Sequence, residues 1–197
     1  MMNEKEIHSY MDDSLGASTV NFLLENTKLI GEKVNQFYIE KPFKLPYLPS
    51  EKDKELANNN NFVRLKNEKN HQIWDNFIHS NEAADRVFIH RILNKCHSNP
   101  DNFETEESIN RIEVELQTVW DASKKQNIVW SKYFLQVADY IDIAWNEGDT
   151  LVGPGRGSGG GFYLNYILDI TQANPLKEKV PTYFWRYLNP ERVSILD

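Results

Sequence analysis

The sequence predicts an α+β fold in which helices predominate and the first strands of a mixed sheet come late in the chain. Two patterns predict it. Apolar residues recur at three- and four-residue intervals through most of the first 146 residues, which is the spacing of a buried helix face. A short apolar run at Leu151–Gly153 then enters a glycine-rich turn, as a strand does, and we expect a second strand at Val193–Asp197.

The size and charge of the chain limit its core and its partners. The 197 residues, with a mass of 23.1 kDa and 40% hydrophobic residues, can bury one ordinary core. The formal net charge is -7, and the acidic residues are spread along the predicted helices, as on a solvated surface. Since binding nucleic acid over a whole surface needs clustered Lys and Arg, we expect any phosphate chemistry to be local.

The hydropathy and the cysteine content indicate a cytoplasmic protein. No run of eighteen apolar residues exists, and the N-terminal MMNEKEIHSY lacks the basic and apolar regions of a signal peptide. The single cysteine, Cys96, has no second thiol with which to form an internal disulfide or a metal knuckle. We therefore expect a soluble protein with no membrane partner.

The first seventy residues divide into a helical segment, 1–40, and a connection, 41–70. Ser18 is a candidate N-cap for a helix that ends near Asn35 and has these apolar residues at helical spacing: Phe22, Leu23, Leu29, Ile30 and Val34. The connection contains prolines at 42, 46 and 49 and consecutive asparagines at 58–61. Because this composition disfavours a packed element, we expect a long surface linker.

Residues 71–197 are expected to form one domain that begins with helices. Apolar stripes predict helices around 74–78 and 87–93 and then, after a break at 98–101, at Glu106–Ser123 and Tyr133–Trp145. Gly148 ends the last of these helices. The tryptophans fall mainly on these stripes, and we expect them to pack in the core and not to stack on bases: Trp74, Trp120, Trp130, Trp145 and Trp185.

Other polar residues in the helical region have structural interpretations. His90 and His97 flank Cys96 at helical spacing, but three donors without a fourth make a poor metal site. Asp139 and Asp142, on the helix before the glycines, are expected to be exposed or paired within the helix.

A glycine-rich motif carries the strongest chemical signal. Residues 153–161 contain six glycines in front of the helix-like segment FYLNYILDI. Glycine removes the side chain that keeps a ligand away from the backbone, and it allows positive φ, so that successive N–H groups can face one anion at a helix N-terminus. Arg156 and Ser158 add a guanidinium and a hydroxyl donor, which are groups suited to a triphosphate.

Three other interpretations apply to the same glycines. Gly155-x-Gly157-x-x-Gly160 fits the dinucleotide fingerprint, but the preceding segment is helical and Arg156 lies inside a turn that is bare in Rossmann loops. A Walker A loop is excluded because no lysine follows any glycine. A flexible glycine hinge without a ligand stays open on the motif alone.

The residues around the motif carry a specific resemblance. The runs YFLQVADYI, GPGRGSGGG and FWRYLNPERVS, the last leading to Asp197, are similar in order and spacing to the palm-domain entry of the bacterial DNA polymerase III alpha subunit family. Looser similarity in LLENTKLIGEKVNQF, KPFKLPYLP and INRIEVELQTVWDASKKQNIVWSKYFL extends the resemblance over nearly the whole chain. The Asn-rich stretch and Gly161 depart from the commoner pattern and indicate a divergent member, of phage or bacterial origin.

The resemblance implies both a fold and a nucleotide site. The fold would be a helical segment, placed after a phosphoesterase-like domain, that leads into the first part of a polymerase beta-like nucleotidyltransferase palm. Gly157 and Ser158 would grip the triphosphate of the incoming dNTP. Arg156 and Arg186 would neutralise the triphosphate and the departing pyrophosphate. We expect Arg192 to serve instead as a structural partner of an acid or a backbone carbonyl.

The resemblance also implies two Mg²⁺ ions, which activate the primer 3′-hydroxyl and stabilise the leaving oxygen. In the family, the strand after LNPERVS carries an Asp-x-Asp pair, and Asp197 matches its first aspartate as the catalytic and metal-binding residue. The second aspartate would be residue 199, so we expect these 197 residues by themselves not to polymerise DNA.

Two functions of different classes follow from this resemblance. The first is part of a DNA-directed DNA polymerase that acts with dNTP, primer-template DNA, the downstream polymerase fragment and replisome subunits. The alternative is a non-catalytic remnant or decoy that binds a nucleotide or a replisome subunit without chemistry. The break at the aspartate pair favours the first function, and the acidic net charge and the missing carboxylates permit the second.

Overall fold

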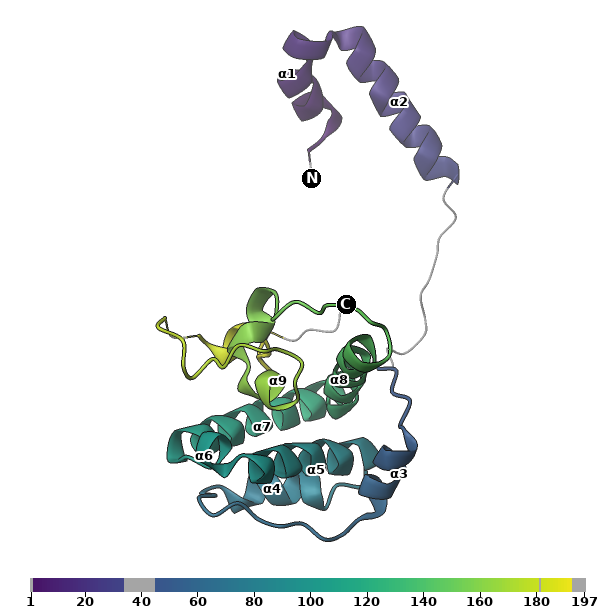
Figure 1. Ribbon diagram of the computed structural model, residues 1–197. Helices are drawn as coiled ribbons and strands as arrows, with labels where there is room; N and C mark the ends of the chain where they lie inside the picture. The colour runs from purple at the N-terminus through teal and green to yellow at the C-terminus, as the bar shows by residue number, and fades with distance from the viewer. Residues whose placement is uncertain (1, 34–44, 181, 193–197) are drawn as a thin grey trace. The chain divides into compact units, whose positions relative to one another are not determined.

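The computed structural model describes residues 2–33, 45–180 and 182–192 (Figure 1). The chain forms two compact units, Met1–Phe43 and Lys44–Asp197, which are described separately below. Within the described residues, none of the helices has the length and apolar character that crossing a bilayer requires.

The first unit consists of two packed helices, α1 (Glu4–Leu15) and α2 (Ala17–Lys33). A capping box between Asn3 and Glu6 begins α1, and Gly16, with φ of 81°, makes the turn between the helices. The prediction that Ser18 caps the second helix is wrong, because the backbone carbonyl of Gly16 already accepts from the Val20 N–H and the helix begins at Ala17. The predicted end near Asn35 lies outside the described residues.

The segment expected to be a surface linker contains a packed helix, α3 (Glu51–Asn58). Ser50 and Asp53 form a capping box at its start. Asp53 is 1% exposed and accepts two hydrogen bonds of 2.7 Å from one guanidinium nitrogen of Arg91 in α5. The linker prediction is therefore wrong for this stretch, since a cap and a buried ion pair stabilise a helix that has little apolar surface.

The predicted helical region is confirmed and forms the core of the second unit. Its helices are α4 (His71–Ile78), α5 (Ala83–Ser98), α6 (Pro100–Phe103), α7 (Glu106–Gln126) and α8 (Ser131–Asn146). Helix α5 is central, because it contacts α3, α4, α6, α8 and α9. The core side chains of α7 recur at the predicted spacing and are fully buried: Ile109, Ile112, Leu116 and Val119.

The tryptophans divide between core and surface. Trp74 is fully buried as predicted, and Trp120 and Trp130 pack against the core. The prediction is wrong for Trp145 and Trp185, which are 40% and 45% exposed. In the case of Trp145 the reason is that the second half of α8 extends beyond the helices that cover its first half.

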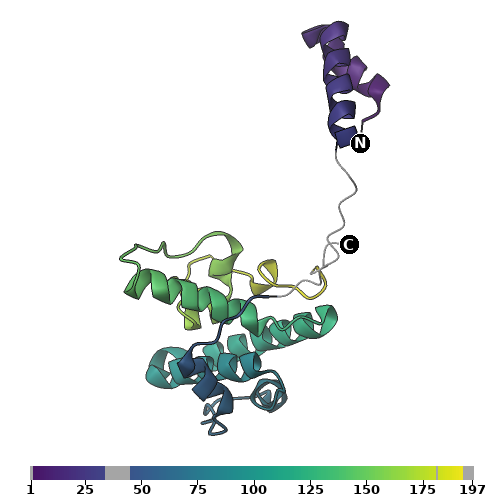
Figure 2. The same ribbon diagram turned by 90° about the vertical axis from the view of Figure 1, so that its right-hand side faces the viewer.

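The segment after α8 lies on the side of α7 away from α4 in both views (Figures 1 and 2). It contains a short 3₁₀ helix η1 (Gly157–Gly161), α9 (Tyr163–Ile167) and a second 3₁₀ turn η2 (Phe184–Arg186). The prediction of a strand at Leu151–Gly153 is wrong, because Leu151 is 92% exposed and the backbone there is irregular. Across the described ranges no strand is present, and Val193–Asp197 lies outside them.

Candidate functional site

The glycine motif forms a tight turn that passes close over two buried side chains. Gly155 and Gly157 have φ of 145° and 66°, which L side chains rarely adopt. A Cβ on Gly155 would lie 3.2 Å from Cγ2 of Thr171, and one on Gly159 would lie 3.5 Å from Nδ2 of Asn165. Glycine is therefore required at 155 both by backbone conformation and by the close approach of Thr171.

A pocket of about 620 Å³ lies beside this turn. One wall consists of the turn itself, including Arg156, Gly157 and Ser158, whose side chains or backbone are exposed to solvent. Tyr133 of α8 and Tyr187 also line the pocket, and their hydroxyl oxygens are 3.4 Å apart. The structure thus brings together three of the predicted nucleotide-binding residues on one pocket.

Two buried polar atoms among the residues that line this pocket lack a hydrogen-bond partner in the described structure. They are Oδ1 of Asn165, a residue that is 1% exposed, and Oγ1 of Thr171, a residue that is 5% exposed. The amide nitrogen of Asn165 donates to the Gly159 carbonyl at 3.0 Å, which fixes the side chain under the turn. The polar side chains of Asn165 and Thr171 therefore lie close to the glycine turn, among the residues that line the pocket.

The start of α9 does not provide the anion site that the sequence predicts there. The helix has five residues, and the backbone N–H groups of Tyr163 and Leu164 donate to the carboxylate of Glu115 at 2.9 and 2.8 Å. Because a side-chain carboxylate already accepts from these two donors, they are not available to an anionic ligand. This part of the prediction is therefore wrong.

Glu115 is a functional candidate that the sequence prediction missed. Its side chain is 0% exposed, and burial raises its pKa to about 7, against the lowering effect of the Tyr163 N–H and Arg111. The sequence contains a pattern that could have identified this residue, because position 115 follows Ile112 by three residues and precedes Val119 by four. An acidic residue inside an apolar helical stripe indicates a buried, paired carboxylate.

The remaining predicted site residues are only partly placed. Arg186 is exposed in η2 and is not among the residues that line the pocket. Arg192 donates to the Trp185 carbonyl at 2.6 Å, in agreement with the expected structural contact. Asp197 lies outside the described residues, so its position relative to Ser158 stays a prediction.

The histidines and the cysteine of α5 have structural environments. Nε2 of His90 donates to the Asn59 carbonyl at 2.8 Å, and the ring stacks on Phe62 with ring centroids 3.9 Å apart. Burial raises the pKa of the Cys96 thiol to about 12, which makes it unreactive. In the part of the chain that the structure describes, no cluster of three His, Cys, Asp or Glu side chains could hold a metal ion.

A larger pocket of about 1080 Å³ lies among α3, α5, α8 and α9, but ion pairs occupy charged groups in its lining. Arg91 bonds to Asp139 of α8 at 2.7 Å as well as to Asp53. Lys95 bonds to Asp169 at 2.6 Å. Asp139 is therefore paired between helices, contrary to the expectation of a contact within its own helix. These charges already have protein partners, so this pocket is the weaker candidate for an anionic ligand.

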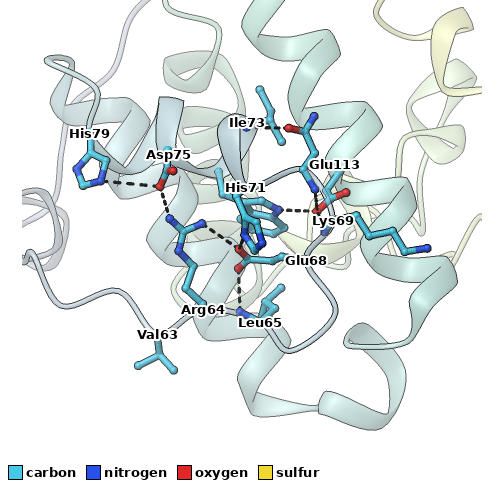
Figure 3. A network of polar contacts seen from close by, with 12 residues as sticks. Val63, Arg64, Leu65, Glu68, Lys69, His71, Ile73, Asp75, His79 and Glu113 are labelled. Atoms are coloured by element: carbon cyan, nitrogen blue, oxygen red, sulfur yellow. Dashed lines mark hydrogen bonds and ion pairs between the residues drawn. The ribbon is translucent and has the colours of Figure 1, made fainter.

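A second buried carboxylate on α7 has a structural role (Figure 3). Oε1 of Glu113 accepts from the backbone N–H groups of Lys69 and Asn70 at 2.8 and 3.0 Å and from the Trp74 indole at 3.0 Å. Close by, Glu68 pairs with Arg64 at 2.9 Å. This network anchors the start of α4.

Comparison with protein families gives one match. The model for the bacterial DNA polymerase III alpha NTPase domain matches residues 64–197, which include the glycine turn and both 3₁₀ segments. No solved structure matches the chain significantly.

Similarity to curated proteins extends over the whole chain. A protein of Bacillus subtilis (strain 168) named probable DNA polymerase YorL is 30% identical over 216 residues, covering 100% of this chain and 15% of that protein. The DNA polymerase III subunit alpha of Deinococcus radiodurans is 40% identical over 99 residues, which is 49% of this chain and 7% of that protein. The corresponding subunit of Aquifex aeolicus is 40% identical over 94 residues, covering 48% of this chain and 7% of the subunit. The chain thus spans at most 15% of the length of these relatives.

Proposed function

Because this chain belongs to the bacterial DNA polymerase III alpha family, we propose that it forms the part of a DNA-directed DNA polymerase that holds the triphosphate of the incoming dNTP. The observation that carries the proposal is one pocket that Arg156, Ser158 and the glycines of the turn line together. The same pocket supports this role over the glycine hinge, because a hinge without a ligand would not need a cation beside its glycines.

Each group at the turn has a chemical task in this proposal. The guanidinium of Arg156 supplies two parallel donors to phosphate oxygens, and it offsets their charge. The Ser158 hydroxyl donates to another oxygen, while the glycines let backbone N–H groups approach without Cβ atoms in between. Arg186 would approach the pyrophosphate from η2, which contacts η1.

Magnesium belongs to the same proposal. The carboxylate of Asp197 is the hard oxygen ligand that Mg²⁺ prefers, and two bound ions would stabilise the attacking and leaving oxygens of the transfer. The strand of a polymerase beta-like palm that would carry Asp197 stays a prediction. So does the expectation that these 197 residues alone do not extend a primer.

The partners follow from the activity proposed for the family. They are dNTP, primer-template DNA, the downstream polymerase segments and replisome subunits, in the cytoplasm. The alternative, a non-catalytic module that binds a nucleotide or a replisome subunit, shares the triphosphate site. Primer extension after addition of the downstream segments distinguishes them: extension supports the polymerase, and triphosphate binding without extension in a demonstrated complex supports the module.

Calorimetric titration of the chain with dNTP and Mg²⁺ tests the triphosphate site directly. We expect Arg156→Ala to weaken binding by about 1.5–3 kcal/mol, because a charge-assisted contact is lost. Arg192→Ala is the matched control, since this arginine already bonds to the Trp185 carbonyl, and it should leave the affinity unchanged. Absence of binding by the wild-type chain, or equal affinities of all three proteins, would return the turn to the hinge interpretation.

A further inference from the structure

An ion pair on α7, between the buried Glu115 and the partly buried Arg111, contacts both segments that carry the proposed triphosphate ligands. Glu115 bonds to the N–H groups of Tyr163 and Leu164, directly after η1. Nε of Arg111, one helical turn earlier, donates to Glu115 Oε1 at 2.5 Å. The glycine turn is thereby attached to α7 through its C-terminal end.

The guanidinium of Arg111 extends the contact to the second segment. Its Nη2 donates to the Gly161 carbonyl at 2.7 Å and to the Thr182 carbonyl at 3.5 Å. The same group lies 5.0 Å from the centroid of the Phe184 ring, the first residue of η2. One side chain therefore joins the end of η1, which follows Ser158, to the start of η2, which ends at Arg186.

The burial of this pair supports a positioning role. Removing two charges from water is costly, and apolar residues of the same volume often stabilise a core as well or better. A buried pair is best attested where it selects one arrangement of the elements that it joins. Here Glu115 and Arg111 satisfy backbone groups of two irregular segments that, in the described structure, have neither strand pairing nor a long helix to hold them.

We infer that Glu115 and Arg111 are positioning residues that set the distance between the glycine turn and η2, and so between Arg156 and Arg186. The inference rests on the proposed function for its consequence, because both arginines are proposed ligands of one triphosphate. Neither Glu115 nor Arg111 is among the residues that line the pocket. Their removal should separate two half-sites without changing the chemical groups in either.

Glu113 provides a matched control on the same helix. It too is a buried carboxylate that accepts from backbone N–H groups, but its partners are Lys69 and Asn70, before α4. Glu113→Gln and Glu115→Gln therefore make the same chemical change at the same depth in one helix. A loss of dNTP affinity that follows from destabilisation alone should appear in both variants. A loss that follows from incorrect positioning of the two segments should appear only in Glu115→Gln.

Two measurements on the whole chain at pH 8, where the Glu115 carboxyl is ionised, test the inference. The first is amide hydrogen exchange without nucleotide. Glu115→Gln places an NH₂ group against a backbone donor, so exchange should accelerate at both 157–164 and 182–188, and Glu113→Gln should accelerate it only around 69–74. The second is titration with dNTP and Mg²⁺, in which Glu115→Gln should bind about tenfold more weakly and Glu113→Gln as tightly as the wild type.

Arg111→Lys provides a second variant that keeps the charge and loses the forked donors. It should accelerate amide exchange at 182–188 and leave the N–H groups of Tyr163 and Leu164 protected. This variant therefore still tests the inference if Glu115→Gln does not fold. Unchanged exchange at 182–188 in both variants would overturn the inference, as would equal loss of affinity in Glu113→Gln. If the wild-type chain binds no triphosphate, the proposed function fails, and the exchange data still show whether the pair joins the two segments.

Discussion

Glu113 and Glu115 are two residues apart on α7, and their buried carboxylates bind backbone N–H groups on opposite sides of that helix. A separation of two residues turns a side chain by about 200° around a helix, which explains the opposite directions. Glu113 holds the segment before α4, and Glu115 holds the segment that begins α9. Helix α7 therefore attaches the proposed site to the rest of the core.

Glu113→Gln should lower the free energy of unfolding by about 1.5–3 kcal/mol, because hydrogen bonds to a charged acceptor are lost while their donors stay buried. Urea unfolding followed by tryptophan fluorescence measures the change. Glu107→Gln, on the exposed face of the first turn of α7, should stay within about 0.5 kcal/mol of the wild type. Equal stabilities of the two variants would show that the Glu113 contacts contribute little.

Gly155→Ala should destabilise the chain by about 1–3 kcal/mol and weaken triphosphate binding. The methyl group would meet Thr171 at 3.2 Å on a backbone with φ of 145°. Gly153→Ala is the control, because a Cβ there meets nothing within 4 Å and its φ is not in the positive region. Thermal unfolding and dNTP titration of both variants check the prediction, which is wrong if alanine is tolerated equally at the two positions.

The helices of the core could be predicted because their signal is local. Ile109, Ile112 and Leu116 recur at helical spacing within one segment, and each is fully buried. Helix α3 could not be predicted in this way, because Asp53 is buried against Arg91, which lies 38 residues away in the sequence. The predicted strand at 151–153 failed for a related reason: an apolar pair does not form a strand unless another segment bonds to its backbone.

The candidate site was predictable to the extent that its residues are consecutive. Arg156, Gly157 and Ser158 belong to one motif, and the structure places them on one pocket. Glu115 was missed because its partners, Tyr163 and Leu164, are 48 and 49 residues away and bond through their backbones. A backbone N–H gives no signal in the identity of its residue.

Arg186→Ala should weaken dNTP binding by about 1.5–3 kcal/mol if its charge-assisted contact to the triphosphate is made. The double variant with Arg156→Ala should lose less than the sum of the single losses, since the two cations compensate the same charge. Isothermal titration of both single variants and the double variant measures the coupling. Strict additivity would mean that the two arginines contribute to triphosphate binding independently of each other.

The ion pair that holds α3 should make the chain sensitive to acid. Burial disfavours the charged form of Asp53, but hydrogen bonds from Arg91, its positive charge and Ser50 together outweigh burial and lower the pKa below 3.8. A lowered pKa means that the folded state binds this proton less readily than the unfolded state. The contribution of Asp53 to stability is therefore complete above pH 3.8 and is lost as the pH falls through the folded-state pKa.

Asp53→Asn should lower the free energy of unfolding at pH 7 by about 3 kcal/mol, because the partly buried guanidinium of Arg91 loses the carboxylate to which it makes three hydrogen bonds. The difference from the wild type should shrink below pH 3.8, where the wild-type carboxylate becomes protonated. Asp139→Asn is the control, because Asp139 also bonds to Arg91 but has the opposite pKa shift. Burial outweighs this contact and raises the Asp139 pKa. The contribution of Asp139 to the free energy of unfolding is therefore lost as the pH rises. Urea unfolding of the three proteins between pH 3 and pH 7 measures these slopes. If the free energy of unfolding of Asp53→Asn falls with decreasing pH as steeply as that of the wild type, Asp53 is not the group that makes α3 sensitive to acid.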